Sequence, residues 1–221
     1  PVAGKRRSRF AVVRNTYPQL AETTMKTYLD WFPPMVFGKY NQTKKQYLIY
    51  WEDKEIEILF KALDAPQDVR DLLSLELTGA HIDEAREIHE DIVTGLLGRI
   101  GRYPSMKDAN GVNPFLSPPQ VSLTTNYPST THWLYKKFVE NKIDGYTMYE
   151  QTQEENIRNL RPNYYADLEK DYADRPDLLR TLVRGEWGIT VKGKRVYPEF
   201  TRTLQLNLWD LKIEDSKIRR K

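Results

Sequence analysis

Short apolar runs, separated by prolines, glycines and charged residues, define the elements that this 221-residue chain is expected to form. Runs rich in β-branched and aromatic residues predict strands over residues 9–14, 47–51, 56–61, 120–126 and 146–149. Apolar residues three or four positions apart predict helices over residues 19–31, 69–73, 85–98, 132–139, 164–172 and 176–183. Because strands alternate with helices, we expect an α/β protein with a mostly parallel sheet flanked by helices.

Residues 75–85 are the most informative part of the sequence, because a short apolar strand there ends in Asp83 and Glu84. Ligands of parallel α/β sheets bind at the carboxyl ends of the strands. Adjacent Asp and Glu at such an end form the Walker B arrangement, in which the Asp orients Mg²⁺ and the Glu polarises the water that attacks the γ-phosphate. Acidic residues are also common at helix N-termini, and the pair alone leaves that second interpretation open.

A second polar strand end follows about forty residues later, at Thr124, Thr125 and Asn126. Right-handed crossovers would bring both strand ends to the same edge of a parallel sheet. Hydroxyl and amide groups can hydrogen-bond to phosphate or water without adding charge, which suits residues that sense the γ-phosphate of a nucleotide. Ordinary turn chemistry after a strand would explain the same residues, so spacing alone does not separate the two interpretations.

Composition narrows the possible kinds of site. The chain has no cysteine, which excludes disulfides and thiolate metal sites. His81 and His89 are eight positions apart, whereas a helical zinc pair needs a spacing of four. A net charge of +3 neither requires nor excludes nucleic acid, although both ends of the sequence are basic. No apolar run approaches the roughly 18 residues of a membrane span.

Several stretches taken together resemble the large terminase subunit of tailed bacteriophages, the ATPase that drives DNA into the capsid. Their order and spacing carry the resemblance, since the shorter pieces are individually unspecific. The resemblance implies an α/β fold of the P-loop NTPase type. The matching stretches are residues 10–20, 75–85, 124–126, 175–188 and 196–200.

The resemblance also assigns roles to individual residues. It implies that Asp83 is the Mg²⁺-side carboxylate and that Glu84 is the catalytic carboxylate. Thr124, Thr125 and Asn126 fall on the motif that contacts the nucleotide and couples its state to movement. ATP and Mg²⁺ are the cofactors that this family implies.

Partners and location follow from the same resemblance. It implies contact with double-stranded DNA, the portal protein, the small terminase subunit and further copies of the large subunit in a ring. The place of action would be the bacterial host cytoplasm, at the portal of the procapsid, without a membrane. Two further residues remain without such a role: Arg14 lies in a motif near the ATP edge, and His81 is expected to serve packing.

The sequence departs from the family pattern at the phosphate-binding loop. No G-x-x-x-x-G-K-[ST] motif occurs, and Gly4-Lys5 is followed by Arg6 rather than Ser or Thr. The backbone cradle and the lysine that grip the β- and γ-phosphates are therefore not among these residues. We expect a partial ATPase domain over residues 1–190, incomplete at its N-terminus, and a linker toward a missing nuclease domain over residues 191–221. Such a chain alone should hydrolyse ATP poorly or not at all.

Two alternatives to a motor fragment remain compatible with the sequence. The chain could be a non-catalytic truncated or split-gene product that acts as a DNA- or portal-binding assembly protein. It could also be another helicase-like NTPase, which would need a different C-terminal signature from that of residues 175–187. An in-frame Walker A motif encoded upstream of Pro1 would favour the motor fragment over the assembly protein.

Overall fold

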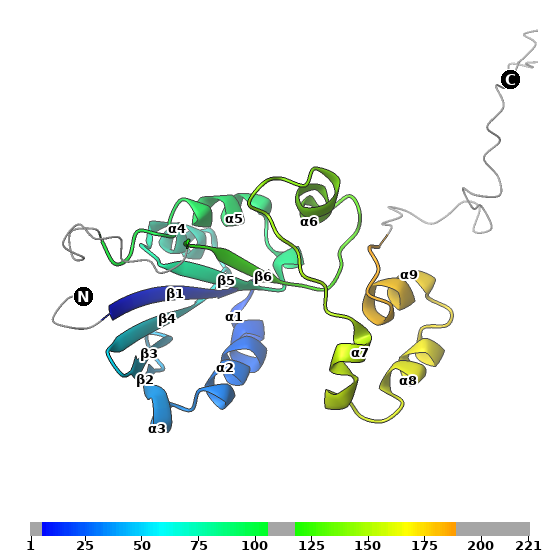
Figure 1. The fold of residues 1–221 in the computed structure, drawn as a ribbon, viewed down its shortest axis with the longest axis horizontal. Coiled ribbons are helices and arrows are strands. Elements are labelled where there is room, and N and C mark those ends of the chain that lie inside the picture. Colours follow the sequence, from blue (N-terminus) through cyan, green and yellow to red (C-terminus); the bar gives the residue numbers. More distant parts are fainter. Residues whose placement is uncertain (1–5, 106–117, 189–221) are drawn as a thin grey trace, which may run out of the picture. The chain divides into compact units, whose positions relative to one another are not determined.

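The computed structural model describes residues 6–105 and 118–188 (Figure 1). The chain divides into two units, residues 1–189 and 190–221, and all described residues belong to the first unit. The linker predicted over residues 191–221 lies outside the described residues. Within them, no helix is both long enough and apolar enough to cross a membrane.

A six-stranded sheet with the order β2-β3-β4-β1-β5-β6 organises the described part of the chain. The strands β4 (Lys54–Ala62), β1 (Arg6–Arg14), β5 (Gly79–Asp83) and β6 (Val121–Thr124) run parallel to one another. The hairpin strands β2 (Gly38–Asn41) and β3 (Gln46–Trp51) extend the sheet in antiparallel pairing. The sheet is mostly parallel, as the sequence predicts, and the strands predicted over residues 47–51 and 56–61 pair as the antiparallel β3 and β4.

The middle of the sheet is apolar on both faces, because successive residues of β1 enter different layers of the core. Ala11 and Val13 are fully buried on one face, and Val12 is buried on the other. Close strand packing also depends on Gly79 at the start of β5. A Cβ atom there would lie 3.0 Å from the carbonyl oxygen of Gln120 and 3.0 Å from the ring of Phe10.

Helices α4 (Pro66–Ser74) and α5 (Glu90–Leu97) cover one face of the sheet, and the short helix α6 (Trp133–Tyr135) adds to the same core (Figure 1). This layer is built from aliphatic side chains, which pack densely around β1 and β5. Its buried members are Ala11, Val13, Leu72, Leu77, Ala80, Ile82, Ala85, Ile88, Val93, Leu96 and Leu134.

A single continuous helix covers the other face. It begins as α1 (Tyr17–Gln19), widens into a π-helical stretch, η1 (Leu20–Met25), and ends as α2 (Lys26–Trp31). The sequence predicts a helix here but gives no sign of its π-helical middle. The layer on this face contains what we call the aromatic cluster, whose rings contact one another at centroid distances of 5.1–6.4 Å and which comprises Tyr28, Phe32, Tyr40, Tyr47 and Phe60.

The remaining helical segments are short. They are α3 (Pro34–Phe37), η2 (Ala85–Glu87), η3 (Lys136–Glu140), α7 (Gln153–Asn156), η4 (Ile157–Asn159), α8 (Tyr164–Asp171), α9 (Pro176–Leu178) and η5 (Leu179–Val183). Gly185 follows the last of them with φ +60°, a left-handed conformation that glycine adopts without strain.

Two predicted elements are wrong. The helix expected over residues 85–98 is divided into η2 and α5, because Ile88 and His89 are extended and His89 Nδ1 accepts the N–H of Asp91 as an N-cap. Ile88 is buried although its backbone is extended, so the apolar residues here have the spacing of a helical face without forming one continuous helix. Residues 146–149, expected to form a strand, are irregular chain, and Tyr149 within them is 90% exposed. High β-propensity forms no strand without a pleated surface to pack on.

Candidate functional site

Three side chains from neighbouring elements hold the carboxylate of Asp83 at the end of β5. Thr124, which ends β6, donates a hydrogen bond to Oδ1 at 3.0 Å. Arg14, which ends β1, donates from Nη1 to Oδ2 at 2.5 Å, and Thr24 of η1 donates to the same oxygen at 2.5 Å. The ends of β1, β5 and β6 therefore meet, as expected for parallel neighbours, and we call Arg14, Asp83 and Thr124 the carboxyl edge.

The surroundings of Asp83 favour its ionised form. Burial is the largest single influence on its pKa and opposes ionisation. The hydrogen bonds from Thr24, Thr124 and Arg14, together with the positive charge of Arg14, outweigh burial and hold the pKa of Asp83 below its ordinary value. The Arg14 and Asp83 side chains are 13% and 25% exposed, so water screens this ion pair only in part.

Glu84 is held quite differently, although it follows Asp83 directly. Its backbone is left-handed, with φ 53° and ψ 54°, a conformation that costs an L-residue about 1–2 kcal/mol. Its Oε2 atom is buried and accepts no hydrogen bond from the described residues, although Arg86 Nε lies 3.1 Å away as an ionic partner. Glu84 thus combines backbone strain with an incompletely satisfied carboxylate, a combination that often occurs at functional positions.

The two residues after Thr124 contact the segment that follows Glu84. Thr125 Oγ1 accepts the backbone N–H of Arg86 at 3.3 Å and donates to the carbonyl oxygen of Asn126 at 3.0 Å. The end of β6 is therefore linked by one hydrogen bond to Asp83 and by another to the chain immediately beyond Glu84.

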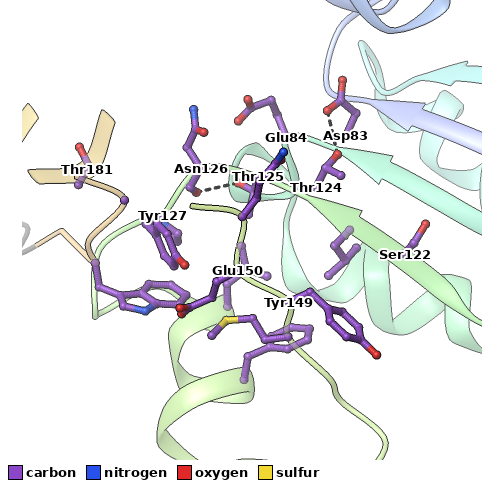
Figure 2. A pocket seen from close by; sticks show the side chains of 18 of the residues that line it. Asp83, Glu84, Ser122, Thr124, Thr125, Asn126, Tyr127, Tyr149, Glu150 and Thr181 are labelled. Carbon is purple, nitrogen blue, oxygen red and sulfur yellow. Dashed lines mark hydrogen bonds between the residues drawn. The ribbon is translucent and has the colours of Figure 1, made fainter. Parts of the chain in front are cut away.

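All five residues predicted for the site line one cavity of about 800 Å³, which runs along β6 (Figure 2). Figure 2 shows Tyr127, Tyr149 and Glu150 on the same cavity. Burial, followed by the hydrogen bond and charge of Glu150, raises the pKa of Tyr127 to about 12, so its hydroxyl keeps its proton at neutral pH. A volume of this size is typical of small-molecule sites.

His132 connects the segment after Glu84 to α6. Its Nδ1 accepts the N–H of Leu134 at 3.2 Å, so in the neutral ring Nε2 carries the proton and donates to the carbonyl oxygen of Arg86 at 3.1 Å. Burial lowers the pKa of His132, opposed only in part by the Arg86 carbonyl and the charge of Glu90. The neutral form is therefore the one that fits this contact.

The donor set of the edge fits a magnesium ion that is shared with a nucleotide. No group of three or more acidic, histidine or cysteine side chains suited to a metal occurs within residues 6–105 and 118–188. Magnesium in phosphate sites needs only one or two carboxylates, because phosphate oxygens and water complete its coordination. Asp83 supplies an ionised carboxylate, and Glu84 adds a buried oxygen without a hydrogen bond.

The structure brings the residues predicted from the two strand ends, 83–84 and 124–126, to one edge of the sheet, while their chemical roles stay predictions. Sequence reasoning gave Arg14 no role and missed Thr24 altogether. Arg14 could have been found, because it ends a predicted strand as Asp83 does. Nothing local distinguishes Thr24 within its helix. His81, expected to serve packing, also makes a polar contact from Nδ1 to Ser122 Oγ at 2.9 Å.

Comparison with known proteins relates this chain to one family of phage proteins. The model of a family described as phage terminase large subunit matches residues 12–186. The chain is similar to the large terminase from a thermophilic bacteriophage, with a TM-score of 0.64 and 13% identity over 85% of this chain and 43% of that chain. Among curated protein sequences, none matches significantly.

Structures of the same thermophilic-phage terminase with nucleotides are also similar. The complex with ADP has a TM-score of 0.59 and 16% identity, and covers 85% of this chain and 42% of that chain. The complex with ATP-γ-S has a TM-score of 0.56 and 14% identity, and covers 84% and 41% of the two chains. At these identities the likeness shows the fold alone, and this chain spans less than half the length of those terminases.

Proposed function

Because this chain belongs to the phage terminase large subunit family, we propose that it contributes the carboxylate side of a DNA-packaging ATPase site. The observation that carries the proposal is the meeting of Asp83 with Thr124 at the carboxyl edge, beside a cavity that Glu84 also lines. Parallel sheets bind ligands at this edge, and an ionised carboxylate there is the kind of group that a nucleotide-bound Mg²⁺ requires.

Each carboxylate has its own task in this proposal. Asp83 would hold the cation through Oδ1, and Glu84 would orient the attacking water. Bound Mg²⁺ would neutralise negative charge on the phosphates. Glu84 suits its task because Oε2 accepts no hydrogen bond from the described residues, so that a water molecule could donate to it beside its ionic partner Arg86.

The β6 end is the proposed link between nucleotide state and movement. Thr124 contacts Asp83, and Thr125 contacts the backbone of Arg86, two residues after Glu84. A shift of this strand end on phosphate release would therefore reach both carboxylates. In the complete motor, such shifts in a ring of subunits would drive double-stranded DNA through the portal of the procapsid in the host cytoplasm, with the small terminase subunit as a partner.

A steady-state ATPase assay tests the catalytic part of the proposal. The 221-residue chain alone should turn over ATP poorly, because its sequence has no G-x-x-x-x-G-K-[ST] motif. The coding sequence upstream of Pro1 should then be read and expressed in frame with this chain. If it encodes a Walker A motif, we expect Mg²⁺-dependent turnover that Glu84→Gln lowers about 100-fold or more.

The matched control is Glu87→Gln, which alters an exposed carboxylate three residues away and should leave turnover unchanged. Full activity of Glu84→Gln would rule out the proposed catalytic role. A start codon at this position, with no split partner that carries a Walker A motif, would instead support the non-catalytic assembly protein.

A further inference from the structure

Thr24 reaches Asp83 from a helix that also packs on the apolar core of the sheet. Leu20, four residues earlier, is fully buried in the layer that contains the aromatic cluster. Thr23, the neighbouring residue, is exposed, and its hydroxyl donates to the carbonyl oxygen of Gln19 at 2.6 Å within the same helix. Thr24 is half-buried, and its hydroxyl proton goes to Asp83 Oδ2 at 2.5 Å.

The hydrogen bonds to Asp83 are divided unequally between its two oxygens. An ionised carboxylate has about four lone-pair sites, two on each oxygen. Arg14 and Thr24 occupy both sites on Oδ2, whereas Oδ1 receives only the hydroxyl of Thr124 among the hydrogen bonds of the described residues. One acceptor site on Oδ1 thus remains, and Asp83 lines the cavity.

Thr24 lies in a π-helical stretch, a form that η3 and η5 also adopt among the described elements. The π-helical form by itself therefore does not mark the site, whereas the placement of Thr24 within it matters. In η1 the irregular stretch runs from Leu20 to Met25 and contains both the residue that anchors the core and the residue that holds Asp83. Within about one and a half turns, the same helix therefore supplies a buried side chain to the core and a hydrogen bond to Asp83.

We propose that Thr24 is a positioning residue: by holding Oδ2, it keeps the free acceptor site of Asp83 Oδ1 turned toward a divalent cation. This inference rests on the proposed function of the edge as a Mg²⁺–nucleotide site. Thr24 carries no charge, and its hydroxyl donates to Asp83 rather than serving as a ligand in this proposal. Its effect is to restrict the rotation of the carboxylate, as outer partners of metal ligands do.

Binding of Mn²⁺ to the 221-residue chain, followed by electron paramagnetic resonance, provides the test. Thr24→Val keeps the shape of the side chain but removes its proton donor, and we expect Mn²⁺ affinity to fall about tenfold. Thr24→Ser restores a donor and should bind Mn²⁺ within about twofold of the wild type. Thr23 is unsuitable as a control because its Oγ1 lies 3.4 Å from Thr24 Oγ1. Thr27→Val, at an exposed threonine of the same helix, is the matched control and should bind like the wild type.

A thermal double-mutant cycle with Thr24→Val and Asp83→Ala checks the contact without any metal. The loss of Tm caused by Thr24→Val should disappear in the Asp83→Ala background, because the two groups then no longer interact. An equal loss in both backgrounds would show that the contact is absent and would overturn the inference.

The two readouts separate this inference from the proposed function. If the wild type binds Mn²⁺ and Thr24→Val binds it equally well, only the positioning role fails. If the wild type binds no Mn²⁺ while the cycle still shows coupling, the cation function of the edge fails, and the positioning role falls with it. If Thr24→Val binds Mn²⁺ more weakly than the wild type and Thr24→Ser restores the affinity, both the cation function of the edge and the positioning role of Thr24 are supported.

Discussion

Two regions on the same sheet are stabilised in opposite ways. The aromatic cluster consists of large rings that contact one another edge-on or tilted, with no charged member. The carboxyl edge consists of directed hydrogen bonds of 2.5–3.0 Å that converge on the single carboxylate of Asp83. Contacts of the first kind depend on the total apolar area buried, whereas contacts of the second kind depend on the position of each donor.

This difference separates stability from chemistry within one fold. Apolar burial is the dominant favourable term in folding, so the aromatic cluster should set how stable the protein is. The carboxyl edge should set how well its carboxylates are placed. The helix from Tyr17 to Trp31 contributes to both regions, because Tyr28 belongs to the aromatic cluster and Thr24 donates to Asp83 of the carboxyl edge.

The largest expected effect comes from emptying the aromatic cluster. Phe60 is 1% exposed and contacts the rings of Tyr28 and Tyr40, so Phe60→Ala should lower the free energy of unfolding by about 3–5 kcal/mol. Urea denaturation measures this loss. Trp31→Ala, at a side chain that is 77% exposed, is the control and should change stability by only about 0.5 kcal/mol. Equal losses in both variants would contradict the division of tasks.

Breaking the ion pair of the carboxyl edge should cost less. Arg14→Ala leaves the partly buried carboxylate of Asp83 without its charged donor, and we expect a loss of about 1.5–3 kcal/mol in the same denaturation experiment. The control is Arg180→Ala, which removes an exposed ion pair with Glu186 and should cost about 0–1 kcal/mol. If Arg14→Ala loses no more unfolding free energy than the control, the ion pair contributes little to the stability of the carboxyl edge.

Relief of backbone strain at Glu84 should have a smaller effect of opposite sign. Glycine adopts the left-handed conformation freely, so Glu84→Gly should stabilise the protein by between about 0 and 1 kcal/mol. Glu87→Gly, in a short helix without positive φ, should instead destabilise it by about 0.5–1 kcal/mol. Calorimetric Tm values distinguish the two, and destabilisation by Glu84→Gly would show that its side chain contributes more to the fold than its strain costs.

The smallest expected effect is on pH dependence. The pKa of His132 is lowered in the folded protein, so the unfolded chain binds a proton more readily. The stability contributed by the neutral ring is complete above about pH 6.5 and is lost as pH falls through the folded value. Between pH 7.5 and 5.5, the Tm of the wild type should fall about 1 °C further than that of His132→Asn, which can still cap α6. Parallel Tm curves would exclude this contribution.

Sequence reasoning predicted the parts of this structure that depend on local pattern. The buried strands around residues 9–14 and 79–83 follow from short apolar runs, and the shared position of Asp83 and Thr124 follows from the geometry of parallel sheets. The segment 146–149 was mistaken for a strand because propensity does not reveal whether a partner strand is available.

Other features depend on tertiary contacts that no local pattern encodes. The left-handed backbone at Glu84 is one such feature, and the extended Ile88 and His89, which divide the helix after it, are another. Thr24 lies 59 residues from Asp83 in the sequence, and an ordinary helical period gives it no special place. A strand end can be recognised from composition, but a donor that arrives from another layer cannot.

The π-helical stretch from Leu20 to Met25 also restricts how the chain length can vary. Insertion or deletion of one residue turns the rest of a helix by about 100°. Such a change here would move either Thr24 away from Asp83 or Tyr28 away from the rings of Tyr47 and Phe60. Surface loops of homologous proteins commonly gain and lose residues. In this helix, insertion or deletion of one residue would need a second, compensating change of length nearby in the same helix.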